Sequence, residues 1–206
     1  MKKNLKIVVV GDGSCGKTSL IVAQAGGSFC DQYTPTAFDD YAIEALVNGK
    51  TKIVTVCDTA GEEDFNQLRP LSYPDADVFI VCYSVERPDS VKRIREKWIP
   101  EIRHYCPTAP ILIVGNKKDI REESNRKISH DSGLGNNENC LSPNVKISDA
   151  ETLAKEFSLY PLIECSAKNR ENIRLVFDTA IRAALTARNL AGNKVLASIM
   201  KLKLVF

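Results

Sequence analysis

A glycine-rich segment, GDGSCGKT at residues 11–18, stands between an apolar run and a helical pattern. The run Leu5–Val10 before it is rich in β-branched residues, and Lys17–Ala25 after it carries apolar residues three and four positions apart. In this strand–loop–helix context the pattern GxxxxGK[ST] predicts a phosphate-binding loop. Its glycines let backbone amides wrap around phosphates at a helix N-terminus. Lys17 is expected to neutralise the β and γ phosphates of a nucleotide, and the Thr18 hydroxyl to ligate Mg²⁺.

Short apolar runs alternate with longer helical patterns along the whole chain. The apolar runs are Leu5–Val10, Thr51–Cys57, Val78–Cys82, Ile111–Val114 and Leu162–Cys165. Helical spacing covers Lys17–Ala25, Ser90–Tyr105, Ser148–Phe157 and Asn172–Arg188. Apolar runs of this length suit strands that are buried on both faces, so the alternation predicts helices packed on both faces of a mostly parallel sheet.

One further strand is expected to pair differently from the others. Tyr41–Val47 alternates apolar and polar residues, and Asn48-Gly49 separates it from Thr51–Cys57. Asn-Gly between two such segments is a specific signal for an antiparallel hairpin. The predicted fold is therefore an α/β P-loop domain with a six-stranded, mostly parallel sheet.

Composition limits the kind of protein further. The 206 residues, 44% of them apolar, suit one domain with a full core. The net charge of +2 indicates no nucleic-acid surface, so we expect no nucleic-acid partner. Seven scattered cysteines without CxxC spacing are typical of reduced thiols in a cytoplasmic protein. No apolar stretch approaches the roughly 18 residues that a membrane-spanning helix needs.

We expect the domain to occupy residues 1–188, with a polar surface insertion at about 121–146, and residues 189–206 to form a C-terminal extension. Val195, Ile199, Leu202 and Phe206 would share one face of a helix, with Lys194, Lys201 and Lys203 nearby. A helix on a membrane surface is one interpretation of this pattern, and the location would then be peripheral. A frayed extension is the favoured interpretation, because short helices are only marginally stable on their own.

Two segments after the expected strands indicate which base is bound. The sequence Asn116-Lys117-Lys118-Asp119 follows Ile111–Val114. The carboxylate of Asp119 can accept hydrogen bonds from N1 and the exocyclic amine of guanine, whereas adenine offers an acceptor at N1. Lys117 can lay its aliphatic stem along the base, and the backbone of Ser166-Ala167-Lys168 can cover its O6 edge. The predicted ligands are therefore GTP and GDP.

A third segment, Asp58-Thr59-Ala60-Gly61, follows the run Thr51–Cys57. A carboxylate at the carboxyl end of a parallel strand points into the ligand crevice, where Asp58 can hold Mg²⁺ through water. Gly61 can bring its amide to the γ-phosphate, and Thr36 can bring a hydroxyl to Mg²⁺. Both contacts depend on the γ-phosphate, which predicts a loop that changes with nucleotide state.

These residues resemble the Rho family within the Ras superfamily over about residues 5–188. The resemblance also rests on Gly11-Asp12-Gly13, on Leu68-Arg69-Pro70-Leu71-Ser72-Tyr73, on Glu164-Cys165-Ser166-Ala167-Lys168, on Trp98 and on the place of the polar insertion. It implies that Phe29 lies against guanine, and that effectors bind the first switch segment, Tyr33–Tyr41, and the second switch segment, Gly61–Tyr73. Exchange factors and GTPase-activating proteins are the other implied partners.

Together, the motifs and the resemblance predict a complete site. The nucleotide-binding residues are Gly11, Asp12, Gly13, Ser14, Cys15, Gly16, Lys17, Thr18, Ser19, Phe29, Thr36, Asp58, Gly61, Asn116, Lys117, Asp119, Ser166, Ala167 and Lys168. Lys17, Thr36, Gly61 and Glu62 are the expected catalytic residues, and Thr18, Thr36 and, through water, Asp58 the Mg²⁺ ligands. No activating arginine is identifiable, so a partner is expected to supply one.

The chain departs from the family at three places. Glu62 replaces the family's glutamine, which orients the attacking water; glutamate can accept a hydrogen bond but cannot donate one, and it adds negative charge beside the γ-phosphate. Slow hydrolysis is therefore expected. Cys57 stands where an aromatic residue is usual, which leaves the exchange factor open. No cysteine follows Cys165, so no CaaX prenylation is expected.

The sequence is also compatible with two other functions. Glu62 and the absent CaaX box favour an interaction module that holds GTP without useful turnover. A P-loop kinase that uses ATP would carry the same phosphate loop, but Asn116 and Asp119 argue against it. The main prediction is a Rho-type switch that acts in signalling, on the cytoskeleton or on membrane traffic.

Overall fold

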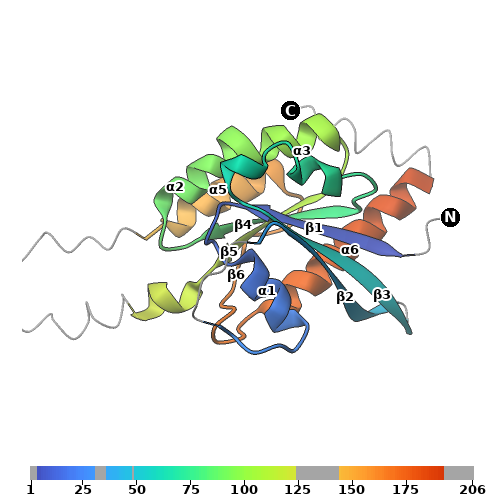
Figure 1. Cartoon of the computed structure of the whole chain (residues 1–206), viewed down its shortest axis with the longest axis horizontal. Helices are drawn as coiled ribbons and strands as arrows, with labels where there is room; N and C mark the ends of the chain where they lie inside the picture. The colour runs from blue at the N-terminus through green and yellow to red at the C-terminus, as the bar shows by residue number, and fades with distance from the viewer. Residues whose placement is uncertain (1–3, 31–35, 48, 124–143, 193–206) are drawn as a thin grey trace, which may run out of the picture.

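Six strands form one sheet in the order β2-β3-β1-β4-β5-β6 (Figure 1) in the computed structural model, which describes residues 4–30, 36–47, 49–123 and 144–192. The strands are β1 (Leu5–Gly11), β2 (Phe38–Val47), β3 (Lys50–Thr59), β4 (Val78–Ser84), β5 (Ile111–Asn116) and β6 (Ile163–Glu164). All neighbours run parallel except β2 and β3. The predicted six-stranded, mostly parallel sheet is confirmed.

The antiparallel hairpin has the predicted connection. Val47 of β2 pairs with Lys50 of β3, so Asn48 and Gly49 join the two strands. Gly49 has a φ of 74°, which suits a two-residue hairpin turn, while Asn48 lies outside the described residues. β2 begins at Phe38, three residues before the predicted start, so the strand extends toward the predicted first switch segment.

Three helices follow their predicted ranges closely: α1 (Lys17–Gln24), α5 (Ile147–Phe157) and α6 (Ile173–Gly192). The helix expected at Ser90–Tyr105 is instead three consecutive pieces: α2 (Pro88–Arg93), the π-helical η3 (Ile94–Trp98) and α3 (Ile99–Tyr105). Pro100 has no N–H to donate to the carbonyl of Glu96, which interrupts the α-helical hydrogen bonds here.

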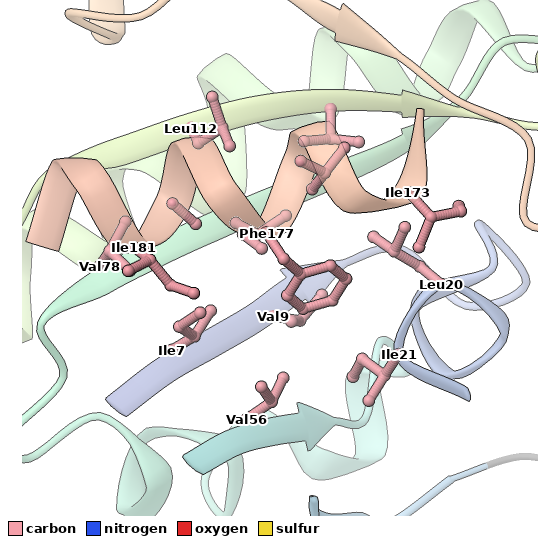
Figure 2. Close-up of a cluster of buried hydrophobic side chains, with 14 of the residues drawn as sticks. Ile7, Val9, Leu20, Ile21, Val56, Val78, Leu112, Ile173, Phe177 and Ile181 are labelled. Atoms are coloured by element: carbon pink, nitrogen blue, oxygen red, sulfur yellow. The ribbon is translucent and has the colours of Figure 1, made fainter. Parts of the chain in front are cut away.

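The helices cover both faces of the sheet (Figure 1), as predicted. On one face, α1 and α6 bury Leu20, Ile21 and Phe177 against strand residues such as Ile7 and Val9 (Figure 2). On the other face, the helical pieces α2, η3 and α3 pack with α5 against Val8, Val10, Phe79 and Val81. Both faces of the central strands are therefore apolar, which explains why these strands are continuous apolar runs in the sequence.

Two predicted features fall largely outside the described residues. Of the polar insertion at 121–146, residues 124–143 are not described, while residues 118–123 are helical. The tail from Asn193 to Phe206 is not described either, although α6 continues to Gly192, beyond the expected end at Arg188. No helix in the described ranges has the length and apolar character needed to cross a bilayer.

Candidate functional site

The site lies where the parallel strands end. β1 ends at Gly11, β3 at Thr59 and β5 at Asn116, and parallel strands place these ends at one edge of the sheet. Two 3-10 turns, η1 (Glu63–Phe65) and η2 (Arg69–Ser72), lie between β3 and β4. The segments that follow the three strands are therefore brought together, although up to 105 positions separate their ends.

The phosphate loop has a backbone that only glycine suits at two places. Gly11 has φ of 147°, and a Cβ there would lie 2.1 Å from the carbonyl oxygen of Cys82. Gly16 has φ of 88°, and a Cβ there would lie 2.3 Å from Nδ2 of Asn116. The loop then enters α1, where Leu20 N–H donates to the Gly16 carbonyl at 2.9 Å. The predicted tight turn and helix start are thus both present.

Lys17 is held inside this loop. Its ammonium nitrogen donates to the carbonyl oxygens of Gly11 and Asp12, each at 2.9 Å, and the residue is buried. A buried ammonium needs several acceptors, and carbonyl dipoles supply them here. A phosphate bound in the loop would offer stronger, charged acceptors to the same group.

A cavity of about 480 Å³ opens in front of the loop. Most of the predicted site residues line it: Ser14, Gly16, Lys17, Thr18, Ser19, Phe29, Thr36, Gly61, Glu62, Asn116, Lys117, Asp119, Ala167 and Lys168. Sequence reasoning missed six lining residues: Val22, Ala23, Ser28, Cys30, Thr59 and Ile120. Ser28 and Cys30 flank Phe29 and could have been found by adjacency, whereas Val22 and Ala23 look like ordinary helix residues in the sequence.

Six other predicted residues do not line the cavity: Gly11, Asp12, Gly13, Cys15, Asp58 and Ser166. The side chain of Asp12 is directed elsewhere, because the indole Nε1 of Trp98 donates to its Oδ1 at 2.9 Å and the residue is buried. Cys15 is also buried, and its carbonyl accepts from the thiol of Cys82 at 3.7 Å. The side chains of Asp12 and Cys15 are therefore buried behind the loop and do not line the cavity.

Oxygen atoms of three residues converge at the start of α1. The Thr18 hydroxyl donates to Oδ2 of Asp58 at 2.5 Å and lies 2.8 Å from the Thr36 hydroxyl. The other carboxylate oxygen, Oδ1 of Asp58, is buried and has no hydrogen-bond partner among the described residues. Burial raises the pKa of Asp58, while the Thr18 hydrogen bond and the charge of Lys17 lower it. A hard cation prefers such oxygen ligands and would compensate the buried carboxylate, so these residues fit Mg²⁺.

The base-reading residues are fixed by hydrogen bonds to each other. Ser166 donates from its hydroxyl to Oδ1 of Asp119 at 2.6 Å, which orients that buried carboxylate. Asn116 donates to the carbonyls of Cys15 and Gly16 at 3.2 and 3.0 Å, and its Oδ1 accepts from the Ala167 N–H at 3.2 Å. Asn116 thus ties the three segments of the site together, a role that its motif alone does not reveal.

Lys117 is held in an unusual backbone conformation at the cavity wall. Its φ is 66°, and its ammonium pairs with Glu86 at 2.5 Å. The ion pair draws the charged end of Lys117 toward Glu86, so its aliphatic stem is the part that remains for a flat ring.

The second switch segment contacts the phosphate loop at Gly61. A Cβ on Gly61 would lie 2.4 Å from the nitrogen of Gly13 and 2.4 Å from the carbonyl carbon of Asp12. Glu62 follows directly, lines the cavity and precedes the turn η1. The residue expected beside an attacking water therefore lies within the same cavity as Lys17 and Thr36.

Apolar side chains are exposed on the β2–β3 hairpin and on the second switch segment. Phe38 is 50% exposed and Ile53 55% exposed, while Leu68 and Leu71 of the second switch segment are 59% and 75% exposed. Of the predicted first switch segment, residues 33–35 lie outside the described ranges. Cys57 is buried in the core cluster that includes Tyr73 and Trp98, and burial together with the Asp40 carboxylate raises the pKa of its thiol to about 12. Because it is buried, Cys57 presents no side chain to the surface at the position where an aromatic residue is usual in the family.

The chain is similar to known proteins over most of its length. The model of the Ras family matches residues 6–186. The Rho-related GTP-binding protein RhoB of Homo sapiens is 45% identical over 183 residues, covering 89% of this chain and 90% of RhoB. RhoB of Mus musculus and RhoB of Rattus norvegicus match with the same identity and coverage.

Proposed function

Because the chain belongs to the Ras family as a Rho-type small GTPase, a class that binds GTP and hydrolyses it, we propose that it is a signalling switch with slow turnover. The observation that carries this proposal is the cavity that joins the phosphate loop, Thr36, Glu62 and Asp119. GTP would order the two switch segments for an effector, and hydrolysis would release them.

The phosphates would be held chiefly by charge and by backbone amides. Lys17 would exchange its two loop carbonyls for β- and γ-phosphate oxygens, and backbone amides at the start of α1 would bind the same charge. Mg²⁺, held by Thr18, Thr36 and, through water, Asp58, would supply positive charge between the two phosphates. The buried Oδ1 of Asp58, which meets no donor in the part of the chain that the structure describes, supports this placement, because an acceptor buried without a donor is costly.

Specificity for guanine would come from Asp119. Its carboxylate, oriented by Ser166, would accept from N1 and the exocyclic amine of guanine. Adenine would place an acceptor opposite one carboxylate oxygen, and two acceptors repel each other in a buried site. Phe29, which is 42% exposed at the cavity, and the stem of Lys117 would cover the two faces of the ring.

Slow hydrolysis would follow from Glu62. The attacking water is expected between Thr36, Gly61 and Glu62, where Glu62 can accept a hydrogen bond from it. Glutamate cannot donate to the oxygens that gain charge in the transition state, and its own charge opposes that change. Intrinsic turnover is expected to be measurable and its stimulation by activating proteins weak.

The partners would be effectors that contact Tyr33–Tyr41 and Gly61–Tyr73, together with exchange factors and activating proteins. The exposed apolar side chains of Phe38, Leu68 and Leu71, which belong to these two segments, support such a surface. We also propose a cytoplasmic location, supported by the unpaired, buried thiols of Cys15, Cys82 and Cys165. The pathway would be cytoskeletal or in membrane traffic.

The test measures the nucleotide that freshly purified protein carries, together with single-turnover hydrolysis and competition between GTP and ATP. Bound guanine nucleotide, slow but measurable turnover and no competition by ATP are expected. A protein that holds mostly GTP with negligible turnover would instead be the interaction module that Glu62 also favours. Effective competition by ATP would contradict guanine specificity.

A further inference from the structure

Arg87 lies at the edge of the phosphate loop, where sequence reasoning found no arginine. Its Nη1 donates to the carbonyl oxygen of Gly13 at 3.0 Å, although 74 positions separate the two residues. The backbone of Arg87 is fixed just before α2, since its N–H donates to Ser84 and its carbonyl accepts from the Ser90 N–H, both at 3.0 Å. Only the long side chain of Arg87 is therefore free to change its contacts.

The partner of Arg87 is next to the contact between the two phosphate-facing segments. Gly13 is the residue whose nitrogen would lie 2.4 Å from a Cβ on Gly61, and the following residue, Ser14, lines the cavity with Glu62. A γ-phosphate that accepts from the Gly61 amide, as the sequence predicts, would lie near the place where Gly61 approaches Gly13. Arg87 itself does not line the cavity, so its guanidinium would leave the Gly13 carbonyl and enter the cavity beside Ser14 to reach that phosphate.

The present contact of Arg87 is weak enough to exchange. Arg87 is exposed, and within the described ranges its side chain has a neutral carbonyl as its partner rather than a carboxylate. Arg93, on the same helix, differs because it pairs with Glu63 at 3.0 Å and lies 3.7 Å from Asp12. A phosphate oxygen is a charged acceptor, and guanidinium binds charged acceptors about twice as strongly as neutral ones.

We propose that Arg87 is a catalytic arginine supplied in cis, which leaves the Gly13 carbonyl and binds the γ-phosphate oxygens during hydrolysis. This inference rests on the proposed function. A water oxygen forms a bond to the γ-phosphorus while the bond to the β–γ bridging oxygen breaks, and the electron pair of that bond stays on GDP. The proton of the water goes to the released phosphate, so Arg87 supplies charge and exchanges no proton. Its positive charge offsets the negative charge of Glu62.

A cis arginine also accounts for the expected turnover. Glu62 removes the donor that family members use and adds a negative charge, while Arg87 supplies donors and a positive charge, so that intrinsic hydrolysis continues. An arginine supplied by an activating protein would then increase the hydrolysis rate only slightly, because Arg87 already occupies its position. A purely structural role, in which Arg87 clamps the phosphate loop, is the rival explanation.

The experiment compares the full chain with Arg87→Ala, Arg87→Lys and Arg95→Ala. Arg95 is the matched control because it is an exposed arginine of the same helical run that pairs with Glu156 at 2.5 Å instead of with the phosphate loop. Three quantities are measured: single-turnover GTP hydrolysis, GDP affinity, and binding of a fluorescent GDP with aluminium fluoride and no other protein. Aluminium fluoride with GDP imitates the transition state, which catalytic groups bind more tightly than the ground state.

We expect the unmodified chain to form the aluminium fluoride complex alone. Arg87→Ala should lose that complex and hydrolyse GTP at least about tenfold more slowly, with Arg87→Lys in between and Arg95→Ala unchanged. GDP affinity should stay within about threefold in all of them, as for an exposed substitution. An Arg87→Ala variant with unchanged rate and complex overturns the proposal, as does an unmodified chain that forms no complex. A parallel fall in GDP affinity and rate would identify the clamp instead. If the chain bound no guanine nucleotide, the proposed function itself would fail.

Discussion

Arg69 of the second switch segment and Glu101 of α3 form a two-point ion pair, with Nε 2.9 Å from Oε1 and Nη2 2.6 Å from Oε2. The hydroxyl of Tyr73 donates to the same carboxylate. Arg69 also donates to the Ala60 carbonyl at 3.1 Å and lies over the Trp98 ring at 4.6 Å. The end of the second switch segment is therefore anchored, and any change with nucleotide state must fall mainly before Arg69.

Removing one partner of this ion pair should destabilise the protein strongly. The side chain of Arg69 is 0% exposed, so Glu101→Ala would leave a buried guanidinium without its counter-ion. Losses of this kind cost about 3 kcal/mol in the free energy of unfolding. Urea unfolding with saturating GDP and Mg²⁺ measures the loss. Glu156→Ala, which breaks the exposed pair with Arg95, is the control and should cost below about 1 kcal/mol. Equal losses in the two variants would refute the anchor.

The carboxylate of Glu101 should also make the stability of the fold depend on pH. Burial raises the pKa of Glu101, but the hydrogen bonds from Arg69 and Tyr73 outweigh it and hold the pKa below its usual value of 4.5. A group with a lowered pKa stabilises the folded state above its unfolded pKa, and this stabilisation is lost as pH falls through the folded value. We expect the urea midpoint of the unmodified chain to fall more steeply below pH 4.5 than that of Glu101→Gln. If the urea midpoints of the two proteins had the same pH dependence, the lowered pKa of Glu101 would not contribute to stability.

Changing Asp119 to Asn should weaken GTP binding and create a different specificity. Asn presents one acceptor and one donor, so the donor faces the exocyclic amine of guanine, which also donates. Two hydrogen bonds to a charged group are lost, and at about 1.5–3 kcal/mol each the affinity should fall by at least about a hundredfold. Xanthine carries a carbonyl in place of the amine, so XTP should bind Asp119→Asn better than GTP. Competition against a fluorescent GDP measures the affinities for GTP and XTP. If Asp119→Asn still bound GTP more tightly than XTP, Asp119 would not recognise the base.

Removing Mg²⁺ should loosen the nucleotide through Asp58 and Thr18. With EDTA, GDP release from the unmodified chain should accelerate by about tenfold or more, because the charge that holds the β-phosphate is withdrawn. In Asp58→Ala, release should already be fast with Mg²⁺ present, and EDTA should add little. Stopped-flow release of a fluorescent GDP measures the rates. Ser72→Ala, a buried hydroxyl outside the cavity, is the control, and EDTA should still accelerate release from it.

The sheet was predictable because its signals are local. Ile7–Val10 and Ile111–Val114 are buried on both faces, and this makes them continuous apolar runs. The three pieces at Pro88–Tyr105 were not predictable as such, because helical spacing continues through the π-helical turn and only Pro100 hints at the break. Boundaries such as the end of α6 depend on tertiary contacts, here the Arg188–Asp77 ion pair at 2.7 Å.

The candidate site was predictable where a motif carries its own chemistry. Lys17, Thr18 and Asp119 follow from the groups that phosphate, Mg²⁺ and guanine require. The direction of the Asp12 side chain was not predictable, since its partner Trp98 lies 86 positions away. Arg87 is a similar case, because an arginine at a helix start looks like an ordinary surface residue until the fold brings it to Gly13.

Replacing Glu62 by Gln should accelerate hydrolysis. Glutamine restores a donor toward the γ-phosphate and removes one negative charge from the cavity that Glu62 shares with Lys17 and Thr36. The single-turnover rate should rise by about tenfold, and stimulation by the catalytic domain of a Rho-type activating protein should rise more, since that domain works with the glutamine. Glu63→Gln, one residue further on and outside the cavity, removes the same charge from the switch without altering the catalytic position, so its rate should match that of the unmodified chain. If Glu62→Gln and the unmodified chain responded equally to the activating protein, Glu62 would be an ordinary exposed switch residue and the slow-turnover proposal would be wrong.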